Sequence, residues 1–238
     1  MLRGLATAFL LFNLAGGAQA ACRQALALAL DVSGSVDLHE YRLQLDGLVT
    51  ALNDPEVRAI LLSQPQAPVA LLVFEWSGPG DQAVLVPWTT VDGPAALKAI
   101  STTLASAERR VTTPGTALGE AMTAGAAHLA GAPDCWKRTL DISGDGKSNL
   151  GPRPRDVKPD VTAEGVTVNG LVVGSDNAGR DVTAELTAYF RAEVIIGPEA
   201  FVETALGYED YAQAMARKLK RELEGRLLSG LDPSGRRP

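Results

Sequence analysis

Short runs of apolar residues alternate along this chain with segments of a different pattern. Apolar runs of this length are typical of buried strands. In the segments between them, apolar residues recur three and four positions apart, the spacing of one face of a helix. The runs predict six strands, which cover residues 26–32, 69–74, 83–88, 136–143, 166–173 and 193–196.

Helices are predicted between the strands. Asp37 is interpreted as an N-cap because Glu40 follows three residues later, as in a capping box. Pro94 is expected to start a second helix, since proline is tolerated in a first turn. The proline-rich stretch 152–159 is expected to be a loop. The remaining helices are predicted after Gly115, at 182–190 and at 208–228. The apolar stripe of the last helix, expected to face the core, consists of Tyr211, Met215, Leu219 and Leu223.

The alternation of strands and helices indicates an α/β fold. This order fits a doubly wound, mostly parallel sheet with helices on both faces. The short turn at residues 78–81 makes its flanking strands an antiparallel pair, so we expect one antiparallel edge strand. Residues 22–228 are predicted to form one domain, and residues 229–238 a flexible tail rich in proline, glycine and arginine.

Composition narrows the class of partner. Hydrophobic residues make up 46% of the chain and charged residues 21%, which is ordinary for a globular protein. The formal net charge is −6. General binders of nucleic acid or of anionic membranes need a basic face, so we expect neither kind of partner.

The N-terminus has the three parts of a secretory signal. Arg3 supplies the charge, residues 5–14 form a short apolar run, and Ala18-Gln19-Ala20 forms a cleavage site. The run is shorter than the roughly 20 residues that span a bilayer, so we expect residues 1–20 to be removed after export to the periplasm or the exterior. A lipoprotein anchored at Cys22 is the alternative, but Gln19 stands where an aliphatic residue would be expected. No later stretch predicts a transmembrane helix.

Two cysteines occupy equivalent places. Cys22 lies nine residues before Asp31, and Cys135 lies ten before Asp145. If the intervening strands are parallel neighbours, both cysteines lie at one edge, about 4.8 Å apart, close to the roughly 5.5 Å between the Cα atoms of a disulfide. An exported protein permits such a bond. The alternative is two unrelated buried thiols.

Polar residues lie at the ends of three of these elements. Asp31, Ser33 and Ser35 follow the first strand, Thr116 precedes a helix, and Asp145 ends a later strand. The carboxyl ends of parallel strands form the ligand-binding edge of such sheets. These residues offer only oxygen donors, which suit Mg²⁺, Mn²⁺ or Ca²⁺ and argue against zinc. Two carboxylates would leave the cation able to accept an acidic group from a partner.

This arrangement resembles a known binding site. Asp31-x-Ser33-x-Ser35, with a Gly-Thr pair downstream at Thr116 and an Asp-Gly pair at Asp145, is similar to the metal-ion-dependent adhesion site (MIDAS) of von Willebrand factor A (VWA) domains. The likeness extends over most of the chain, to small exported bacterial VWA-like proteins. It implies a Rossmann-like VWA fold, direct ligation by the three hydroxyls, and ligation by the two aspartates directly or through water.

Simpler interpretations of these residues remain open. Asp31 and Ser33 also suit a helix cap or tight loop, and Asp145 an ordinary turn. Asp141 and Glu75 depart from the family's pattern and either modify the site or are solvated edge residues. Residues 174–177 also end a strand on this side and are either part of a binding surface or a loop.

Three functions are compatible with this sequence. The first is an exported module, not an enzyme, that grips a carboxylate of a protein partner through the cation. The second is a metal-assisted hydrolase, for which Asp141 or Glu75 would have to serve as base. The third is a structural or assembly protein of the cell envelope. His39 and His128 lack companion ligands and are expected to be surface or half-buried residues.

Overall fold

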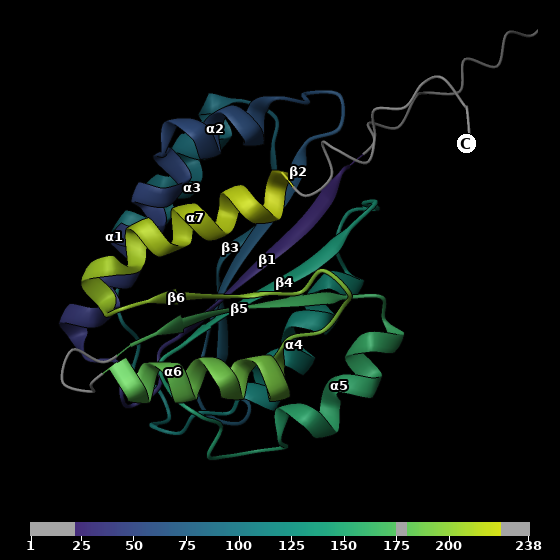
Figure 1. The fold of residues 1–238 in the computed structure, drawn as a ribbon. Helices are drawn as coiled ribbons and strands as arrows, with labels where there is room; N and C mark the ends of the chain where they lie inside the picture. The colour runs from purple at the N-terminus through teal and green to yellow at the C-terminus, as the bar shows by residue number, and fades with distance from the viewer. Residues whose placement is uncertain (1–21, 175–179, 225–238) are drawn as a thin grey trace, which may run out of the picture.

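The computed structural model describes residues 22–174 and 180–224. The predicted signal peptide and C-terminal tail lie outside these residues. One sheet of six strands crosses the molecule in the order β3-β2-β1-β4-β5-β6 (Figure 1). All neighbours are parallel except β2 and β3, which confirms the antiparallel edge strand. The strands are β1 (Gln24–Asp31), β2 (Val69–Trp76), β3 (Gln82–Val91), β4 (Arg138–Gly144), β5 (Thr167–Val173) and β6 (Val202–Ala205).

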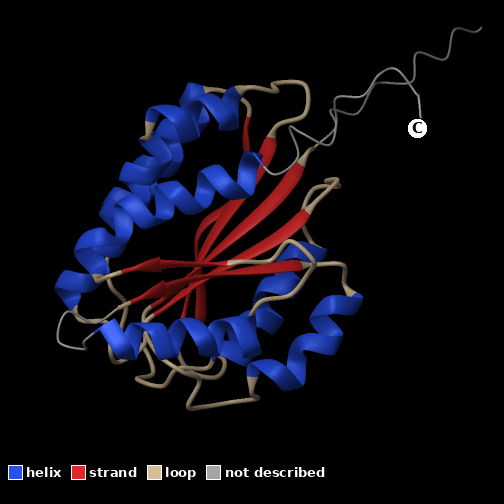
Figure 2. Ribbon diagram, in the orientation of Figure 1, coloured by secondary structure: helices blue, strands red, loops and turns tan. Residues whose placement is uncertain are grey.

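Helices cover both faces of the sheet, so the predicted doubly wound α/β architecture is confirmed (Figures 1 and 2). One face carries α1 (Leu38–Asn53), α2 (Pro55–Leu62), α3 (Pro94–Ser106) and α7 (Tyr211–Glu224). The other carries α4 (Leu118–Ala130), α5 (Pro154–Ala163) and α6 (Arg180–Tyr189). In the described part of the chain, no helix combines the length and apolar character needed to cross a membrane.

The central strand β1 is buried along its whole length because helices cover both of its faces. Leu26, Leu28 and Leu30 enter the core beneath α1 and α7. The alternate residues, Ala25, Ala27 and Ala29, enter the second core, beneath α4. The alternation is the period of two expected of a strand, and Asp31 stands at the carboxyl end of this fully buried strand.

The start of α1 follows the predicted capping box. The Asp37 carboxylate accepts a hydrogen bond from the Glu40 backbone N–H, and the Glu40 carboxylate accepts one from the Asp37 N–H, both at 2.8 Å. These bonds satisfy two backbone donors that the first turn leaves without helical partners. The helix therefore begins directly after the loop at residues 32–36.

The sixth strand was predicted in the wrong place. Residues 190–194 form a π-helix that extends α6, with Phe190 and Val194 buried four residues apart, at helical spacing. Ile196 makes only an isolated antiparallel bridge to Val168. The strand itself is β6, four residues long, of which only Ala205 is fully buried, so its sequence lacks a clear alternating pattern.

Two helices that begin with proline were not predicted. Most of the stretch expected to be a loop belongs to α5, which starts at Pro154 and continues to Ala163. Likewise α2 starts at Pro55, and the Asp54 side chain caps it by accepting hydrogen bonds from the backbone N–H groups of Glu56 and Val57. Proline suits the first turn of a helix, where its missing N–H costs nothing, and α5 also contains Pro159 in its interior.

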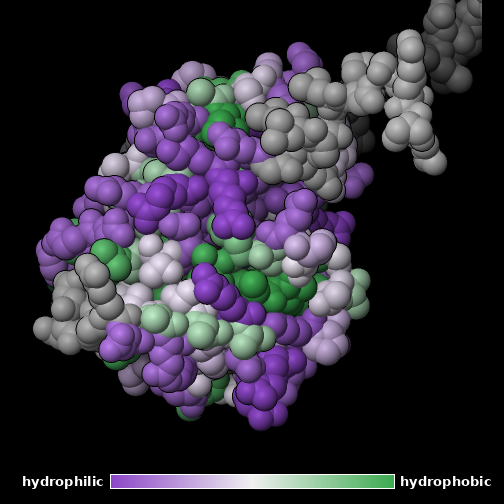
Figure 3. All heavy atoms as spheres, in the orientation of Figure 1, coloured by the Kyte–Doolittle hydropathy of each residue, from purple (hydrophilic) through white to green (hydrophobic). Residues whose placement is uncertain are grey.

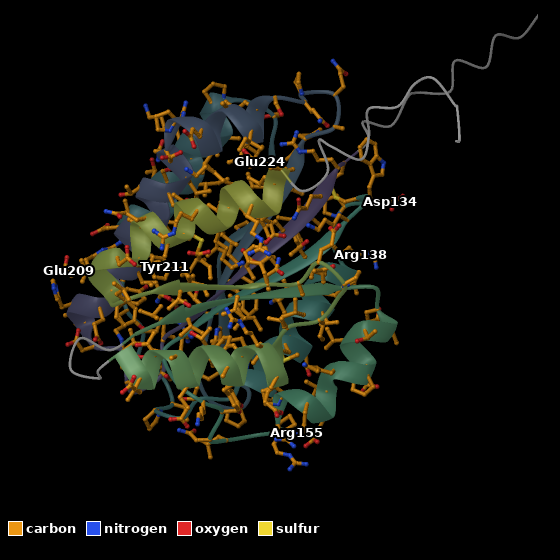
Figure 4. All side chains as sticks on the ribbon, viewed as in Figure 1. Asp134, Arg138, Arg155, Glu209, Tyr211 and Glu224 are labelled. Atoms are coloured by element: carbon orange, nitrogen blue, oxygen red, sulfur yellow. A yellow bond between two sulfur atoms is a disulfide. The ribbon has the colours of Figure 1, made fainter. Side chains whose placement is uncertain are left out.

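The predicted disulfide is confirmed. Cys22 and Cys135 are bonded across 113 residues of sequence, with their Cα atoms 4.4 Å apart. They form a parallel bridge at the amino edge of the sheet, just before β1 and β4. In Figure 4 the neighbouring Asp134 marks this edge, and Glu209 marks the opposite, carboxyl edge. A disulfide of this kind indicates an oxidising compartment.

Replacing both cysteines, Cys22→Ser with Cys135→Ser, is expected to lower the free energy of unfolding by about 4–5 kcal/mol, because the bond closes a loop of more than about a hundred residues in the unfolded chain. Urea unfolding of the oxidised protein and the double variant measures this difference. The reduced wild-type protein is the control and should match the variant. Superimposable curves for all three would show that the bond adds no stability.

Candidate metal site

The candidate site lies where the strand order reverses. From β1 the chain moves outward through β2 and β3, whereas β4 lies on the other side of β1 and continues through β5 and β6. The loops after β1 and β4 therefore part, as at the ligand-binding crevices of doubly wound sheets. Asp31 is the last residue of β1, and Asp145 directly follows β4. A Cβ atom on Gly144 would lie 3.4 Å from Asp31 Oδ2, which places the two segments side by side.

The predicted hydroxyls join the two carboxylates into one cluster. Ser35 Oγ donates to Asp145 Oδ1 at 2.7 Å and lies 3.2 Å from Ser33 Oγ. Thr116 Oγ1 donates to Ser33 Oγ at 3.4 Å. The backbone N–H of Ser33 donates to Asp31 Oδ1 at 2.8 Å. All five residues predicted from the sequence are thus brought together; their role as metal ligands stays a prediction.

The electrostatics of the cluster fit a cation. Asp31 is fully buried, and its Oδ2 has no hydrogen-bond partner in the described part of the chain. Burial, with the charge of nearby Asp145, raises the pKa of Asp31 to about 7. Burial also raises the pKa of Asp145, although the hydrogen bond from Ser35 acts against it. Buried polar atoms are seldom left unpartnered, because their desolvation is then uncompensated. A divalent cation would satisfy the free oxygen and remove the repulsion between the carboxylates.

Such a site would depend on hydroxyl ligands. Within residues 22–174 and 180–224, no group of three or more His, Cys, Asp or Glu side chains is placed to hold a metal ion. The cluster has only two carboxylates, and its other three side-chain donors are neutral oxygens. Oxygen donors of this kind suit hard cations such as Mg²⁺.

The segment at residues 107–117, which carries Thr116, is fixed against the loop after β1. The backbone N–H of Gly34 donates to the Pro114 carbonyl oxygen at 3.0 Å. A Cβ on Gly34 would lie 2.9 Å from both the Cβ and the carbonyl oxygen of Pro114, so only glycine permits this approach. Nearby, Thr112 Oγ1 donates to the Val32 carbonyl oxygen at 2.9 Å.

Arg109 is a supporting residue that sequence reasoning missed. One nitrogen of its guanidinium donates to the carbonyl oxygens of Val32, Ser33 and Val36, at 3.2, 3.2 and 2.8 Å. Because these carbonyl groups point toward Arg109, the hydroxyls of Ser33 and Ser35 can face the cluster. No local pattern reveals the contact, because more than seventy residues separate the partners.

Thr116 is also held from the segment after β4. Its backbone N–H donates to Asn149 Oδ1 at 2.9 Å, and its carbonyl oxygen accepts from the Asn149 N–H at 2.9 Å. The next residue, Ala117, donates its N–H to the Ser77 carbonyl oxygen at 2.8 Å. The chain around Thr116 is therefore bonded to segments following both β2 and β4. Asn149 was not predicted either.

Tyr208 is a third residue that the sequence did not single out. It begins the short 3₁₀ helix Tyr208–Asp210, which follows β6, and it is buried. Burial, with the charges of Asp145 and Asp31, raises the pKa of this phenol well above its usual value. A neutral phenol thus lies near the carboxylates at the β6 side of the site.

Asp141 and Glu75 are not solvated edge residues, because both are buried. The Glu75 carboxylate accepts from Tyr41 Oη at 2.6 Å and from Arg110 Nε at 3.2 Å. Asp141, inside β4, contacts Lys218 of α7. Their partners belong to α1, α7 and the segment after α3 rather than to the five residues of the cluster.

The histidines lie where the sequence placed them. His39 is exposed, 3.9 Å from Glu209. His128 is half-buried against the Phe74 ring, and burial lowers its pKa. Of the segment predicted to line the site or form a loop, residues 175–177 lie outside the described residues.

Residues 21–227 match the model of one protein family, described as "Protein of unknown function (DUF1194)". The chain belongs to this family. No sequence among the curated proteins matches it.

Solved structures with a similar fold include the following three. The pilus adhesin SpaC from Lactobacillus rhamnosus GG is 14% identical with a TM-score of 0.60, over 87% of this chain and 31% of its own. Proximal thread matrix protein 1 (PTMP1) from the mussel byssus, with a zinc-occupied MIDAS motif, is 16% identical with a TM-score of 0.56, over 86% and 48%. A von Willebrand factor type A protein from Catenulispora acidiphila is 13% identical with a TM-score of 0.54, over 85% and 43%.

The present chain therefore has the fold of VWA domains, as its sequence motif implied, and it corresponds to less than half of each of these proteins. At such identities the likeness concerns the fold alone.

Adding Mg²⁺ is expected to stabilise the protein, because a ligand that binds only the folded state shifts the equilibrium toward it. At a hundred times the dissociation constant, the gain is about 2.7 kcal/mol. For a domain of this size that corresponds to a rise in melting temperature of roughly 5–10 °C. Differential scanning fluorimetry with Mg²⁺, Mn²⁺, Ca²⁺ and Zn²⁺ measures the shift and ranks the cations.

Asp31→Asn should abolish this shift, since it removes a buried carboxylate of the cluster. Asp134→Asn is the matched control, because Asp134 is an exposed aspartate at the opposite edge of the sheet (Figure 4). A shift of equal size in wild type and Asp31→Asn would place the cation elsewhere.

Proposed function

We propose that this chain is an exported binding module that grips an acidic group of a protein partner through a divalent cation. The cation would be held by Asp31, Ser33, Ser35, Thr116 and Asp145. The observation that carries the proposal is the buried, unpartnered Oδ2 of Asp31 beside a cluster of hydroxyls. A metal ion bound there supplies a Lewis-acidic centre that can accept a carboxylate from outside.

The charges of the cluster favour a ligand that is itself acidic. Two aspartates balance the charge of a divalent ion without exceeding it, and the hydroxyls of Ser33, Ser35 and Thr116 are neutral. A hard cation with mainly neutral oxygen ligands remains a strong acceptor for a further carboxylate. In VWA domains with a MIDAS, the hydroxyls are direct ligands and the aspartates act directly or through water, and we carry these roles over to the matching residues.

Exposed apolar side chains beside the cluster support a protein partner. Leu38 and Val111, with 70% and 98% of their surface exposed, line one cavity together with Gly34 and Pro114. Exposed apolar groups that gather at one place are typical of protein-binding surfaces. Two further exposed apolar residues follow strands at this same edge, Leu150 after β4 and Leu206 after β6.

A hydrolase is the less favoured function. It would need a general base beside the cation, and the two candidates for that base, Asp141 and Glu75, are held by partners from other elements. The fold is shared with a pilus adhesin and a byssus matrix protein. A structural role in the cell envelope accordingly remains the second candidate, and it differs from the first in needing no cation-dependent capture.

We place the protein in the periplasm or outside the cell. The signal-like residues 1–20 support this proposal, as does the disulfide between Cys22 and Cys135, since such bonds persist in oxidising compartments.

The proposal predicts capture of acidic peptides that depends on the cation. On an array of peptides with an Asp or Glu flanked by apolar residues, and matched Asn or Gln peptides as controls, the protein should bind only the acidic members in the presence of Mg²⁺. Binding should disappear with EDTA and with Asp31→Ala and persist with Asp134→Asn. Capture that survives both EDTA and Asp31→Ala would exclude the metal bridge.

The apolar cavity makes a separate prediction. Val111→Ser should weaken peptide binding roughly tenfold, because a buried valine contributes about 1.5 kcal/mol. The same variant should keep the full thermal shift with Mg²⁺, since Val111 is not part of the oxygen cluster. Isothermal titration with peptide and with Mg²⁺ separates the two effects. Unchanged peptide affinity would place the partner on another surface.

A further inference from the structure

A second group of ionisable side chains lies in the interior, between the sheet and α7. Asp141 from β4 and Lys218 and Glu222 from α7 have only 2%, 0% and 3% of their surfaces exposed. Lys218 Nζ contacts Asp141 Oδ1 and lies 3.6 Å from Glu222 Oε2. The proposed function uses none of the three. The outward side of α7 is hydrophilic (Figure 3). Because Lys218 and Glu222 are buried, α7 has charged groups on its inward side as well.

The contact between Lys218 and Asp141 does not have the features of a stable buried ion pair. In the described part of the chain, Lys218 Nζ and the Asp141 carboxyl have no hydrogen-bond partners other than each other and Glu222. A buried ion pair stabilises a protein only when further hydrogen bonds satisfy its remaining donors and acceptors. Asp141 and Lys218 therefore have fewer partners than a stable buried ion pair needs.

Glu222, in contrast, is fully engaged. Its Oε1 accepts from Gln24 Nε2 at 3.1 Å and lies 3.4 Å from Lys137 Nζ, and its Oε2 accepts from Asn169 Nδ2 at 2.8 Å. These partners fix the carboxylate beside Lys218.

The pKa values of the two neighbouring carboxyl groups, those of Asp141 and Glu222, are shifted in opposite directions. Burial, with the charge of Glu222, raises the pKa of Asp141 to about 7. Burial acts in the same direction on Glu222, but Lys218 and Lys137 outweigh it and lower the pKa of that carboxyl. Around neutral pH, an acid that can be protonated and an ionised base therefore flank one amine. This division of roles is that of an acid–base pair.

We propose that Lys218 Nζ and Asp141 Cγ condense to an intramolecular isopeptide bond, with Glu222 as the proton acceptor. In this step the ammonium of Lys218 gives one proton to Glu222, and the neutral amine attacks Cγ of the protonated Asp141 carboxyl. The Cγ–Oδ bond breaks, and the departing hydroxyl takes a second proton from nitrogen and leaves as water. One amide forms, one water is released, and the remaining proton stays on Glu222.

The surroundings favour this condensation. The Phe201 ring lies over Lys218 Nζ, with its centroid 5.1 Å away, and helps exclude water. Asp141 is held in register between Leu28 of β1 and Asn169 of β5. Two reacting groups held in contact gain the large advantage of an intramolecular reaction. A cavity lined in part by Asn169, Phe201 and Glu222 adjoins the cluster and offers an exit for the water. The amide also removes two charges from the interior.

Peptide mass spectrometry tests the proposal on the wild-type chain, reduced so that the disulfide does not link fragments. Trypsin should release a branched species in which residues 139–147 are joined to residues 218–220, with the cleavage after Lys218 blocked. Its mass should be lower than that of the two separate peptides by one water. Recovery of residues 139–147 only as a free peptide would overturn the proposal.

Variants then separate the roles. Lys218→Arg keeps the positive charge but offers no amine for this amide, and should leave the peptide at 139–147 free. Glu222→Gln should reduce the branched species at least tenfold, and an undiminished yield would exclude Glu222 as proton acceptor. Lys220→Arg is the matched control on the same helix, because Lys220 pairs with Glu56 at the surface, 2.8 Å away, and this variant should keep the full yield.

Discussion

The parallel pairing of β1 with β4 is the constraint from which the other features of this protein derive. Five residue pairs are in register along it, from Ala25 with Arg138 to Ala29 with Ile142. Beyond the two ends of this ladder lie the disulfide and the candidate cation cluster. Because the two strands run in one direction, the residues that precede both meet at one edge and those that follow both meet at the other. The covalent link and the acidic cluster are therefore two consequences of one pairing.

The same strand, β4, presents two chemically different faces. Leu140 and Ile142 enter the apolar core beneath α4. Thr139, Asp141 and Ser143 face α7, where Ser143 Oγ lies 3.0 Å from Tyr211 Oη and Thr139 Oγ1 accepts from the Gln24 side chain at 3.1 Å. A polar seam in the interior is costly unless each group has a partner. Thr139 and Ser143 at the two ends of this seam have neutral partners, whereas Asp141 contacts only the ionisable groups of Lys218 and Glu222, which is why that position carries the chemical proposal.

Local patterns in the sequence were sufficient for the elements with strong periodicity. The capping box at Asp37, the buried run of β1 and the order of the three polar segments are each visible within a few residues, and each agrees with the structure. The similar spacing of the two cysteines, nine residues before Asp31 and ten before Asp145, also depended only on position along two strands. These features could be predicted because strand direction converts sequence position into position at an edge.

Other features depend on contacts between distant segments. Arg109 reaches the carbonyls of the loop after β1 from more than seventy residues away, and no pattern around it differs from that of a surface arginine. Lys218 and Glu222 adjoin the predicted apolar stripe of α7 but are charged, so the apolar periodicity did not single them out as buried residues. The π-helix at residues 190–194 was predicted wrongly for a different reason: its apolar residues fit a strand or a helix equally well. Only packing decides between these alternatives.

The segment that holds the cluster in place also forms part of the surface where a partner would bind. The segment at residues 109–116 contains Arg109 and Thr112, which hold the loop after β1, and Thr116, whose hydroxyl belongs to the cluster. Between them stands Val111, almost fully exposed. A partner that covered Val111 would press on the segment that positions Thr116, and a cation that fixed Thr116 would fix Val111 in turn. Because such coupling is reciprocal, the cation and the apolar contact would each strengthen the binding of the other.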